Sequence, residues 1–413
     1  MIKSNRYPHT DSEARRLLRC GAVAGFGPYG FGPDSQPGAI LVDRGRVIAA
    51  GAAADIEAAY AGEWARVDDY PDLLILPGLV NAHCHLELTD VGPLPNPGTF
   101  VGWIGQLRRQ TSEWDPDRFA MSARSGAAAA RQAGTDSIGD IASFDGAAKI
   151  RREAGLGGCS FLELFGLGSP WDEVAKRRLG QAADGFEPHA PYSAGREIFR
   201  LASESDRPSA CHLAETPEEC RFIADGDGPF LELLRAMGKW SDEFAAGYGQ
   251  GLSPVQWAEP FLRRKPWLLA HVNYATDADI AILADTGSSV AYCPIASEYF
   301  GHENHRYREM LEAGINVCLG TDSVVCQPPY AAQPMGMLQQ IRHLHRRDAT
   351  PASTLLKLAT INGHRALIRQ PKIARLAGVT FDPGSDLPPL DQVMRSAARC
   401  QPIELEPRFT GDS

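Results

Sequence analysis

The chain has 413 residues, a hydrophobic content of 44% and a formal net charge of −10. This length is enough for a large domain and a second, smaller one, and the hydrophobic content is that of a folded globular protein. The negative charge argues against a nucleic-acid partner, because proteins that bind phosphate backbones usually carry a basic face.

The first twenty residues are polar and of mixed charge, and no window of the chain is apolar enough for a secretion signal or a membrane span. We therefore expect a cytoplasmic protein with no membrane partner. Nine cysteines are scattered without a Cys-x-x-Cys pair. Four of them lie in apolar, strand-like runs and are predicted to be reduced core residues, whereas a disulfide framework is typical of short secreted chains. These four are Cys159, Cys211, Cys293 and Cys318.

The N-terminal part of the chain predicts a small β domain. Residues 39–50 alternate in polarity around Asp43-Arg44-Gly45, which is typical of a β-hairpin, and residues 73–76 form a further strand candidate.

From residue 76 to residue 367, short β-rich runs alternate with helical stretches. Eight such runs are present, at residues 79–85, 136–142, 159–165, 185–191, 209–215, 267–273, 289–294 and 315–322. The stretches between them, such as 117–134, 194–205, 277–287 and 306–314, carry apolar residues at helical spacing and often end at glycine. Eight strand–helix units predict an α/β fold with a (β/α)8, TIM-like barrel. Residues 351–367 predict one more pair of helices, and the chain becomes Pro-rich with weak strand signals after about residue 372.

The two longest connections, 86–133 and 216–266, follow the first and fifth predicted strands. Connections of this length in a compact domain usually cover a site, so both are candidate lids. Residues 100–110 of the first place an apolar face on a helix, for which packing is favoured over substrate contact. This face consists of Phe100, Trp103, Ile104 and Leu107.

Polar side chains stand where five of the predicted strands end, which is where the active-site loops of such a barrel converge. They are five histidines and one carboxylate: His83, His85, His189, His212, His271 and Asp322. Each follows apolar residues that would lie inside the strand, so we expect all six around a single mouth. No packing requirement explains this arrangement.

The His83-x-His85 pair places two imidazoles on the same face of a strand, and neutral imidazole is a favoured ligand of zinc or iron. Alone, the pair is weak evidence, since core and surface histidines also occur at this spacing. His212 and Asp322 could add a third nitrogen and an oxygen, leaving a position for water as a catalytic metal requires. The four residues together predict a metal site.

Glu215 lies three residues after His212, where it could face a metal-bound water as a proton shuttle. The alternative is a carboxylate at a helix start, because the residues that follow it, 216–219, are typical of one. His271 could hydrogen-bond the nucleophile and the leaving group, although a single histidine on an apolar strand is more often a buried structural residue.

The motifs LPGLVNAHCHLEL, PHAPYS, HLAE, AHVNY and LGTDS resemble, in order and spacing, those of the amidohydrolase superfamily, in its cytosine-deaminase-like and chlorohydrolase-like branch. The resemblance extends from about residue 39 to about residue 367. It implies one divalent metal, zinc in preference to iron, held by His83, His85, His212 and Asp322. It also implies that Glu215 is the proton shuttle and that His271, with Asp322, completes the catalytic group.

Binuclear relatives carry a carboxylated lysine at the end of the fourth strand, where this chain has His189. The resemblance therefore implies a single metal and makes His189 a substrate contact. The family also ends in a strand that completes a small β domain, whereas residues 375–379 here lead into the Pro-rich tail. We expect residues 17–75 and 368–413 to form a small β-sandwich-like domain that is abbreviated at its C-terminal end.

The reaction implied is hydrolysis of a non-peptide carbon–nitrogen bond, with ammonia released from an amino-substituted purine, pyrimidine, aminofutalosine or triazine-like heterocycle. Residues 100–109 and 139–144 resemble those of aminodeoxyfutalosine deaminases. Further substrate contacts are expected from Glu87, Glu163 and His302, for which rim salt bridges and an exposed histidine are the alternatives. Hydrolysis of a cyclic amide or a chloro-heterocycle remains an alternative, as does a catalytically silent barrel that only binds its ligand. By analogy with relatives, we expect a homodimer.

Overall fold

The large unit is built around eight parallel strands, which match the eight runs expected from the sequence. In the computed structural model, which describes residues 15–166, 171–181, 183–368 and 373–405, they form two four-stranded sheets, β5-β6-β7-β8 and β9-β10-β11-β12. The strands are β5 (Leu79–Cys84), β6 (Thr135–Ala142), β7 (Gly157–Leu164), β8 (Gly185–Pro188), β9 (Ala210–Leu213), β10 (Leu268–His271), β11 (Ser289–Tyr292) and β12 (Asn316–Leu319). The predicted α/β class with parallel strands is confirmed.

Two isolated parallel bridges link the sheets at both of their edges. Phe186 of β8 pairs with Ser209, just before β9, and Cys84 of β5 pairs with Asp322, just after β12. Between the strands, the apolar side chains form one buried cluster that draws members from both sheets, including Ile141 and Leu268. The cluster includes residues near the amino ends of β7, β9 and β10, namely Cys159, Ala210 and Leu268.

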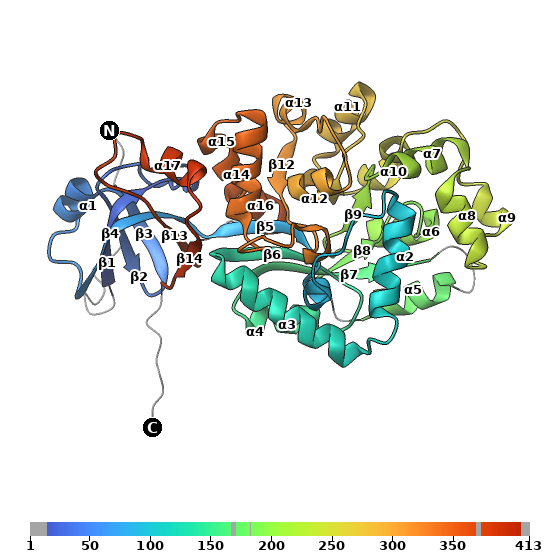
Figure 1. Cartoon of the computed structure of the whole chain (residues 1–413), viewed down its shortest axis with the longest axis horizontal. Coiled ribbons are helices and arrows are strands. Elements are labelled where there is room, and N and C mark those ends of the chain that lie inside the picture. Colours follow the sequence, from blue (N-terminus) through green and yellow to red (C-terminus); the bar gives the residue numbers. More distant parts are fainter. Residues whose placement is uncertain (1–14, 167–170, 182, 369–372, 406–413) are drawn as a thin grey trace. The chain divides into compact units, whose positions relative to one another are not determined.

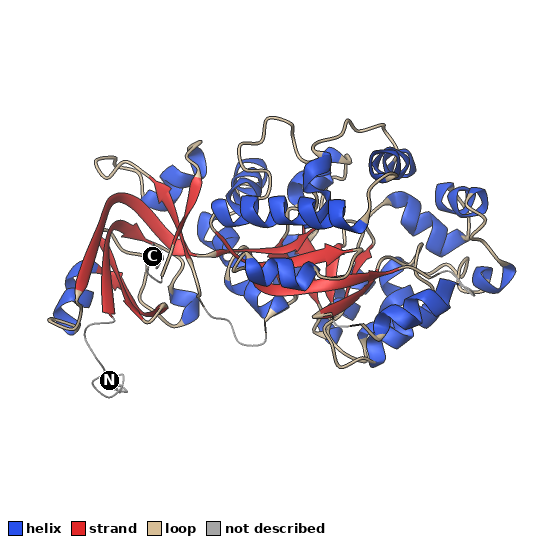
Figure 2. Cartoon of the chain, turned by 90° about the horizontal axis from the view of Figure 1, so that it is seen from below, coloured by secondary structure: helices blue, strands red, loops and turns tan. Residues whose placement is uncertain are grey.

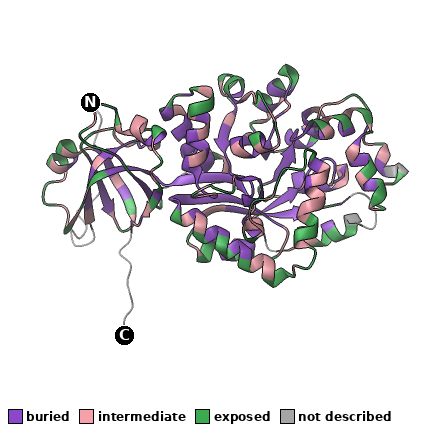
Figure 3. Ribbon diagram, in the orientation of Figure 1, coloured by how far each residue is buried: buried purple, intermediate pink, exposed green. Residues whose placement is uncertain are grey.

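Helices alternate with the strands and cover them on both sides (Figures 1 and 2). They are α3 (Pro116–Gln132), α4 (Ala147–Glu153), α5 (Trp171–Leu179), α6 (Arg196–Glu204), α7 (Pro217–Asp225), α8 (Pro229–Ala236), α9 (Asp242–Ala245), α10 (Pro254–Leu262), α11 (Asp277–Thr286), α12 (Pro294–Tyr299), α13 (Tyr307–Glu312), α14 (Met337–Asp348), α15 (Ala352–Leu358) and α16 (Ile361–Leu367). Figure 3 shows that the strands are buried, whereas the helices turn their exposed sides outward. None of the described helices is both long and apolar enough to cross a bilayer.

The two long connections contain helices of their own. The first holds a 3-10 helix, η3 (Leu86–Val91), followed by α2 (Phe100–Thr111) and α3, and the second holds α7 to α10. On α2, Phe100 and Trp103 are buried, and the Phe100 ring contacts Phe230 of α8 and Phe300, which follows α12. The apolar face of α2 therefore packs on the second connection and on the loop after β11.

The remaining residues form a separate compact unit, Met1–Gly78 with Ile373–Ser413, whereas the large unit comprises Leu79–Lys372. It contains one six-stranded sheet in the order β14-β13-β4-β1-β2-β3. Its elements are β1 (Arg15–Val23), η2 (Gly27–Tyr29), β2 (Gly38–Asp43), β3 (Arg46–Ala52), α1 (Ala53–Ala59), β4 (Arg66–Pro77), β13 (Leu376–Thr380), α17 (Pro389–Arg395) and β14 (Cys400–Ile403). The expected hairpin is β2–β3, and β13 pairs with β4. Residues 369–372 and 406–413 of the expected C-terminal segment lie outside the described residues.

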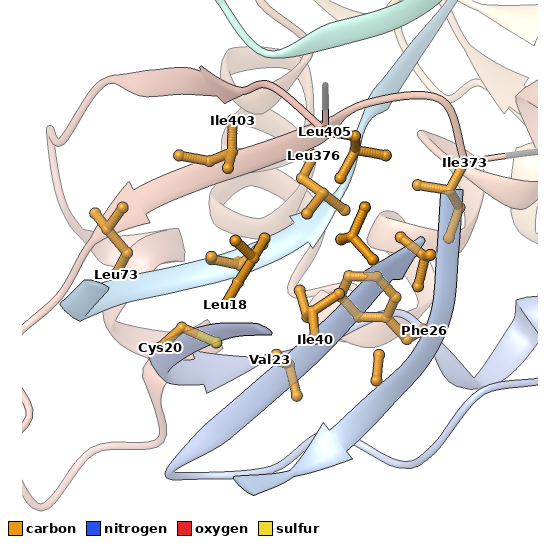
Figure 4. Close-up of a cluster of buried hydrophobic side chains, with 14 residues drawn as sticks. Leu18, Cys20, Val23, Phe26, Ile40, Leu73, Ile373, Leu376, Ile403 and Leu405 are labelled. Atoms are coloured by element: carbon orange, nitrogen blue, oxygen red, sulfur yellow. The ribbon is translucent and has the colours of Figure 1, made fainter. Parts of the chain in front are cut away.

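One face of this sheet encloses a buried hydrophobic cluster (Figure 4). Leu18 and Ile40 from the N-terminal strands meet Leu376 and Ile403 from the C-terminal strands in it. Burial of these side chains is the main force that can hold the two ends of the chain in one sheet. The four cysteines expected in the core are buried and form no disulfide, as predicted.

Candidate active site

Five histidines and one aspartate, which lie in or just after five of the strands, meet at the carboxyl ends of the strands. His85 Nε2 lies 3.3 Å from His212 Nε2 and 3.6 Å from Asp322 Oδ1, and His83 Nε2 lies 3.9 Å from the same oxygen. The ring centroids of His271 and His189 are 5.4 Å and 4.8 Å from that of His212. The six side chains therefore lie in a single cluster.

Two residues of the cluster, and the residue that follows one of them, have a backbone conformation that residues other than glycine rarely adopt. His271 and Asp322 have φ angles of 69° and 60°, and Val272, after His271, has 52°. Left-handed conformations of non-glycine residues cost of order 1 kcal/mol or more and persist where the surroundings impose them. His305 Nε2 donates to the carbonyl oxygen of His271 at 2.7 Å, and His83 O accepts from Asp322 N at 3.0 Å. These bonds hold the two strand ends in place.

Three overlapping groups could hold a metal ion, with ligand atoms within 4.8 Å of one another. They are His83, His85 and Asp322; His83, His212 and His271; and Glu215, His271 and Asp322. All four residues predicted as ligands belong to these groups. His271 and Glu215 also belong to them, so the distances alone leave more than one ligand set open.

His83 tests whether these residues fit a metal. The residue is 1% exposed, and neither ring nitrogen has a hydrogen-bond partner among the described residues. Buried polar atoms almost always have a partner, so this imidazole fits a metal ligand better than a structural histidine. Burial and the neighbouring histidines lower its pKa well below the usual value, which keeps it in the neutral form that metals bind.

Glu215 is 4% exposed, and its Oε1 lies 3.4 Å from His271 Nε2. The start of α7 does not use this carboxylate, because the Thr216 side chain accepts from Glu219 N there. Glu219 in turn accepts from the backbone N–H of Glu215 at 2.8 Å. Burial, together with the Asp322 and Glu219 carboxylates, raises the pKa of Glu215 well above its usual range. A carboxyl in this environment can carry a proton near neutral pH.

His189 and Glu163 lie together beside the cluster, with 3.6 Å between His189 Nε2 and Glu163 Oε1. The His189 ring stacks on Phe165, which is 42% exposed, and its Nδ1 lies 2.5 Å from Ser193 Oγ. These two expected substrate contacts therefore lie between the buried histidines and an exposed aromatic ring.

The other two expected substrate contacts have different surroundings. Glu87 is buried, and its Oε2 accepts from the backbone N–H of Ser143 at 2.8 Å, which links η3 to the end of β6. His302 Nδ1 lies 2.9 Å from the Tyr274 hydroxyl, while its buried Nε2 has no partner among the described residues. One carboxylate oxygen of Glu87 is thus already committed to the backbone, whereas His302 keeps a free ring nitrogen.

Two residues of the site were missed in the sequence. Glu187 on β8 is fully buried, and its Oε1 lies 3.4 Å from His212 Nδ1. A charged residue within the short run GFEP, two positions before His189, was an available signal. His305 gave no signal, because it lies in a loop and its partner is a backbone carbonyl.

Asp140 on β6 is a further buried acid, and the pH dependence of protein stability can test whether burial raises its pKa. The residue is 1% exposed, and burial raises its pKa to about 8, against the effect of a hydrogen bond from Leu86 N. In the unfolded chain an aspartate ionises at about pH 4. Between about pH 4 and 8 the folded protein therefore binds a proton that the unfolded chain lacks, so the free energy of unfolding falls as the pH rises.

We expect Asp140→Asn to make this decline shallower by up to about 1.4 kcal/mol per pH unit, since asparagine has no proton to lose. Urea unfolding of the metal-free protein from pH 5 to pH 8 measures it. The exposed Asp145→Asn is the control for loss of one negative charge. Parallel pH profiles of wild type and Asp140→Asn would contradict the expectation.

Comparisons with known proteins show the family to which the chain belongs. The chain is 28% identical over 393 residues to a 5-methylthioadenosine/S-adenosylhomocysteine deaminase of Nitratidesulfovibrio vulgaris, covering 89% of this chain and 82% of the relative. It is 27% identical over 342 residues to an aminodeoxyfutalosine deaminase of Deinococcus radiodurans, covering 75% and 76%. The structure of an adenosine deaminase from Xanthomonas campestris with bound zinc shares the fold, with a TM-score of 0.70 and 23% identity over 93% of this chain and 89% of that one. The model of the amidohydrolase family matches residues 74–377, most of the chain, and the protein therefore belongs to that family.

Proposed function

We propose that the protein is a metal-dependent deaminase that replaces the amino group of a heterocycle by a carbonyl and releases ammonia. The observation that carries this proposal is the convergence of His83, His85, His212 and Asp322 with Glu215 beside them. The names of the relatives support it, since both are deaminases. Their substrates make an adenosine-like compound the preferred substrate class.

The fold proposed for this function is a closed (β/α)8 barrel over residues 76–367. Both seams between the two sheets carry a parallel bridge, which supports closure. Residues 17–75 and 368–413 form the small β-sandwich-like domain, and the cluster of Figure 4, with members from both ends of the chain, supports this.

The proposed metal is a single zinc ion with His83, His85, His212 and Asp322 as ligands. When bound, zinc lowers the pKa of a coordinated water toward neutrality and so supplies a nucleophile. Asp322 and His271 would orient the attacking water toward the carbon that bears the amino group. Glu215 would accept the first proton that the water loses and give it to the adjacent ring nitrogen, and Asp322 with His271 would pass the second water proton to the departing amine. The products are ammonia and the carbonyl form of the ring.

The substrate contacts proposed are His189, Glu163, Glu87 and His302. His189 and Glu163 are paired beside the exposed Phe165, where a ring or sugar can reach them. His302 lies close enough to His271 to add to the lowering of its pKa, which is due mainly to burial. Tyr274 can donate to His302 Nδ1, which would leave Nε2–H as a donor to the substrate.

The function is tested by measuring ammonia release from a panel of compounds. The panel contains 5′-methylthioadenosine, S-adenosylhomocysteine, adenosine, aminodeoxyfutalosine, cytosine and an aminotriazine, together with a chlorotriazine and a cyclic amide. We expect one ammonia per molecule consumed for at least one adenosine-like compound. Turnover of only the chlorotriazine or the cyclic amide, without ammonia, would overturn the proposal.

A further inference from the structure

Glu187 is a buried acid that the proposed reaction does not use. It lies on β8 in register with Glu163 of β7, so the two side chains point to the same face of the sheet. Glu187 is 0% exposed, and neither of its carboxylate oxygens has a hydrogen-bond partner among the described residues. Burying a carboxyl group without a partner costs several kcal/mol, so its presence here requires a reason.

The polar group that faces Glu187 is the imidazole of His212. The Nδ1 of this ring lies 3.4 Å from Glu187 Oε1 and 3.1 Å from the carbonyl oxygen of His189. Both oxygens are acceptors, which places the ring hydrogen on Nδ1. The other nitrogen, Nε2, then presents its lone pair on the opposite side, where His85 Nε2 lies 3.3 Å away.

The carbonyl of His189 alone could fix the tautomer, but the carboxylate adds negative charge next to the N–H. A carboxylate that accepts from the second nitrogen of a metal-bound histidine holds the ring orientation and makes the ligand more basic. Loss of such a partner typically weakens metal binding by 10- to 100-fold. Burial, together with the carboxylates of Glu163, Glu215, Asp322 and Asp140, raises the pKa of Glu187 well above its usual range, and a cation held by His212 would favour the charged form of Glu187.

We propose that Glu187 is a positioning residue for the metal site, which faces the Nδ1 side of the His212 ring and thereby sets the orientation and basicity of that ligand. The inference rests on the proposed function, because it takes His212 as a ligand. Glu187 does not touch the substrate, and its effect is on metal affinity first and on turnover only through it.

The test compares Glu187→Met, which removes the acceptor at similar volume, with Glu187→Gln, which keeps an oxygen acceptor without the charge. Zinc affinity is measured by competition with a chromophoric chelator. We expect Glu187→Met to bind zinc about 10- to 100-fold more weakly than wild type, and Glu187→Gln to recover part of the loss. Glu153→Met, on the exposed side of α4, is the control for the loss of one carboxylate away from the site. It should keep the wild-type affinity.

A second measurement separates this role from a purely structural one. Urea unfolding of the metal-free Glu187→Met protein should show stability equal to or above that of wild type, since the substitution removes a buried acid. Wild-type zinc affinity in Glu187→Met, or an equal loss in Glu153→Met, would overturn the inference while leaving the deaminase proposal intact. A wild-type protein that releases ammonia without binding any divalent metal would overturn both the inference and the metal site.

Discussion

Replacing Glu215 by glutamine should lower kcat by at least about 10²-fold while the protein keeps its metal. Glutamine has the size of glutamate, so the 4% exposed side chain can keep its place near His271 Nε2. It cannot hold or release the proton that the ring nitrogen must receive when the carbon–nitrogen bond is attacked. Turnover of the best substrate of the panel, with metal content measured by elemental analysis, tests this expectation.

The matched control for this variant is Glu218→Gln. Glu218 lies in the first turn of α7, three residues after Glu215, and is only half-buried. Its substitution makes the same change of charge close to the site and should leave kcat within about twofold of wild type, as surface substitutions usually do. Full turnover by Glu215→Gln would refute its role as proton shuttle.

The strands of the large unit were predictable because each is a short apolar run that ends where polar residues begin. All eight predicted runs overlap a strand of the structure, and His83, His212 and Asp322 lie in or just beyond those strands. The distance along the chain between these residues was no obstacle to the prediction, since parallel strands bring their carboxyl ends to one side.

The first strand of the small unit was not predicted, because its sequence, RRLLRCGAV, reads as the continuation of a polar N-terminus. Its arginines are neutralised by partners distant in sequence, such as Asp68, whose Oδ2 lies 2.6 Å from Arg16 Nε. Leu17 and Leu18 of this strand are fully buried on opposite faces of the sheet. Ion pairs of this kind depend on the finished fold and leave no periodic signal in the chain.

The supporting residues of the site were harder to predict than the groups they support. His305 acts on His271 through a backbone carbonyl, and the left-handed backbone of His271 becomes visible only in the structure. The partner of Glu87 could not be predicted for a similar reason. It is the backbone N–H of Ser143, which any residue type except proline could supply. Sequence patterns report side-chain chemistry, whereas these contacts depend on the course of the main chain.

Removal of the metal should abolish turnover, because no side chain of the site could make water nucleophilic at neutral pH as effectively as zinc. It should also destabilise the protein, since a ligand that binds only the folded state stabilises it by about 4 kcal/mol when present at a thousand times its dissociation constant. Activity and thermal unfolding are measured after dialysis against a chelator and again after zinc is restored. We expect both to recover together.

His85→Ala provides the control for this experiment, because it removes one predicted ligand that is 3.3 Å from His212 Nε2 and 3.6 Å from Asp322 Oδ1. Added zinc should then raise the unfolding temperature of the variant only slightly, and a chelator should lower it only slightly. His343→Ala, which removes a histidine whose Nε2 lies 2.9 Å from Glu298 Oε2 on the helices outside the strands, should respond to zinc as wild type does. Persisting ammonia release by protein shown to be free of metal would instead assign the activation of water to a side chain, with Glu215 as the first to examine.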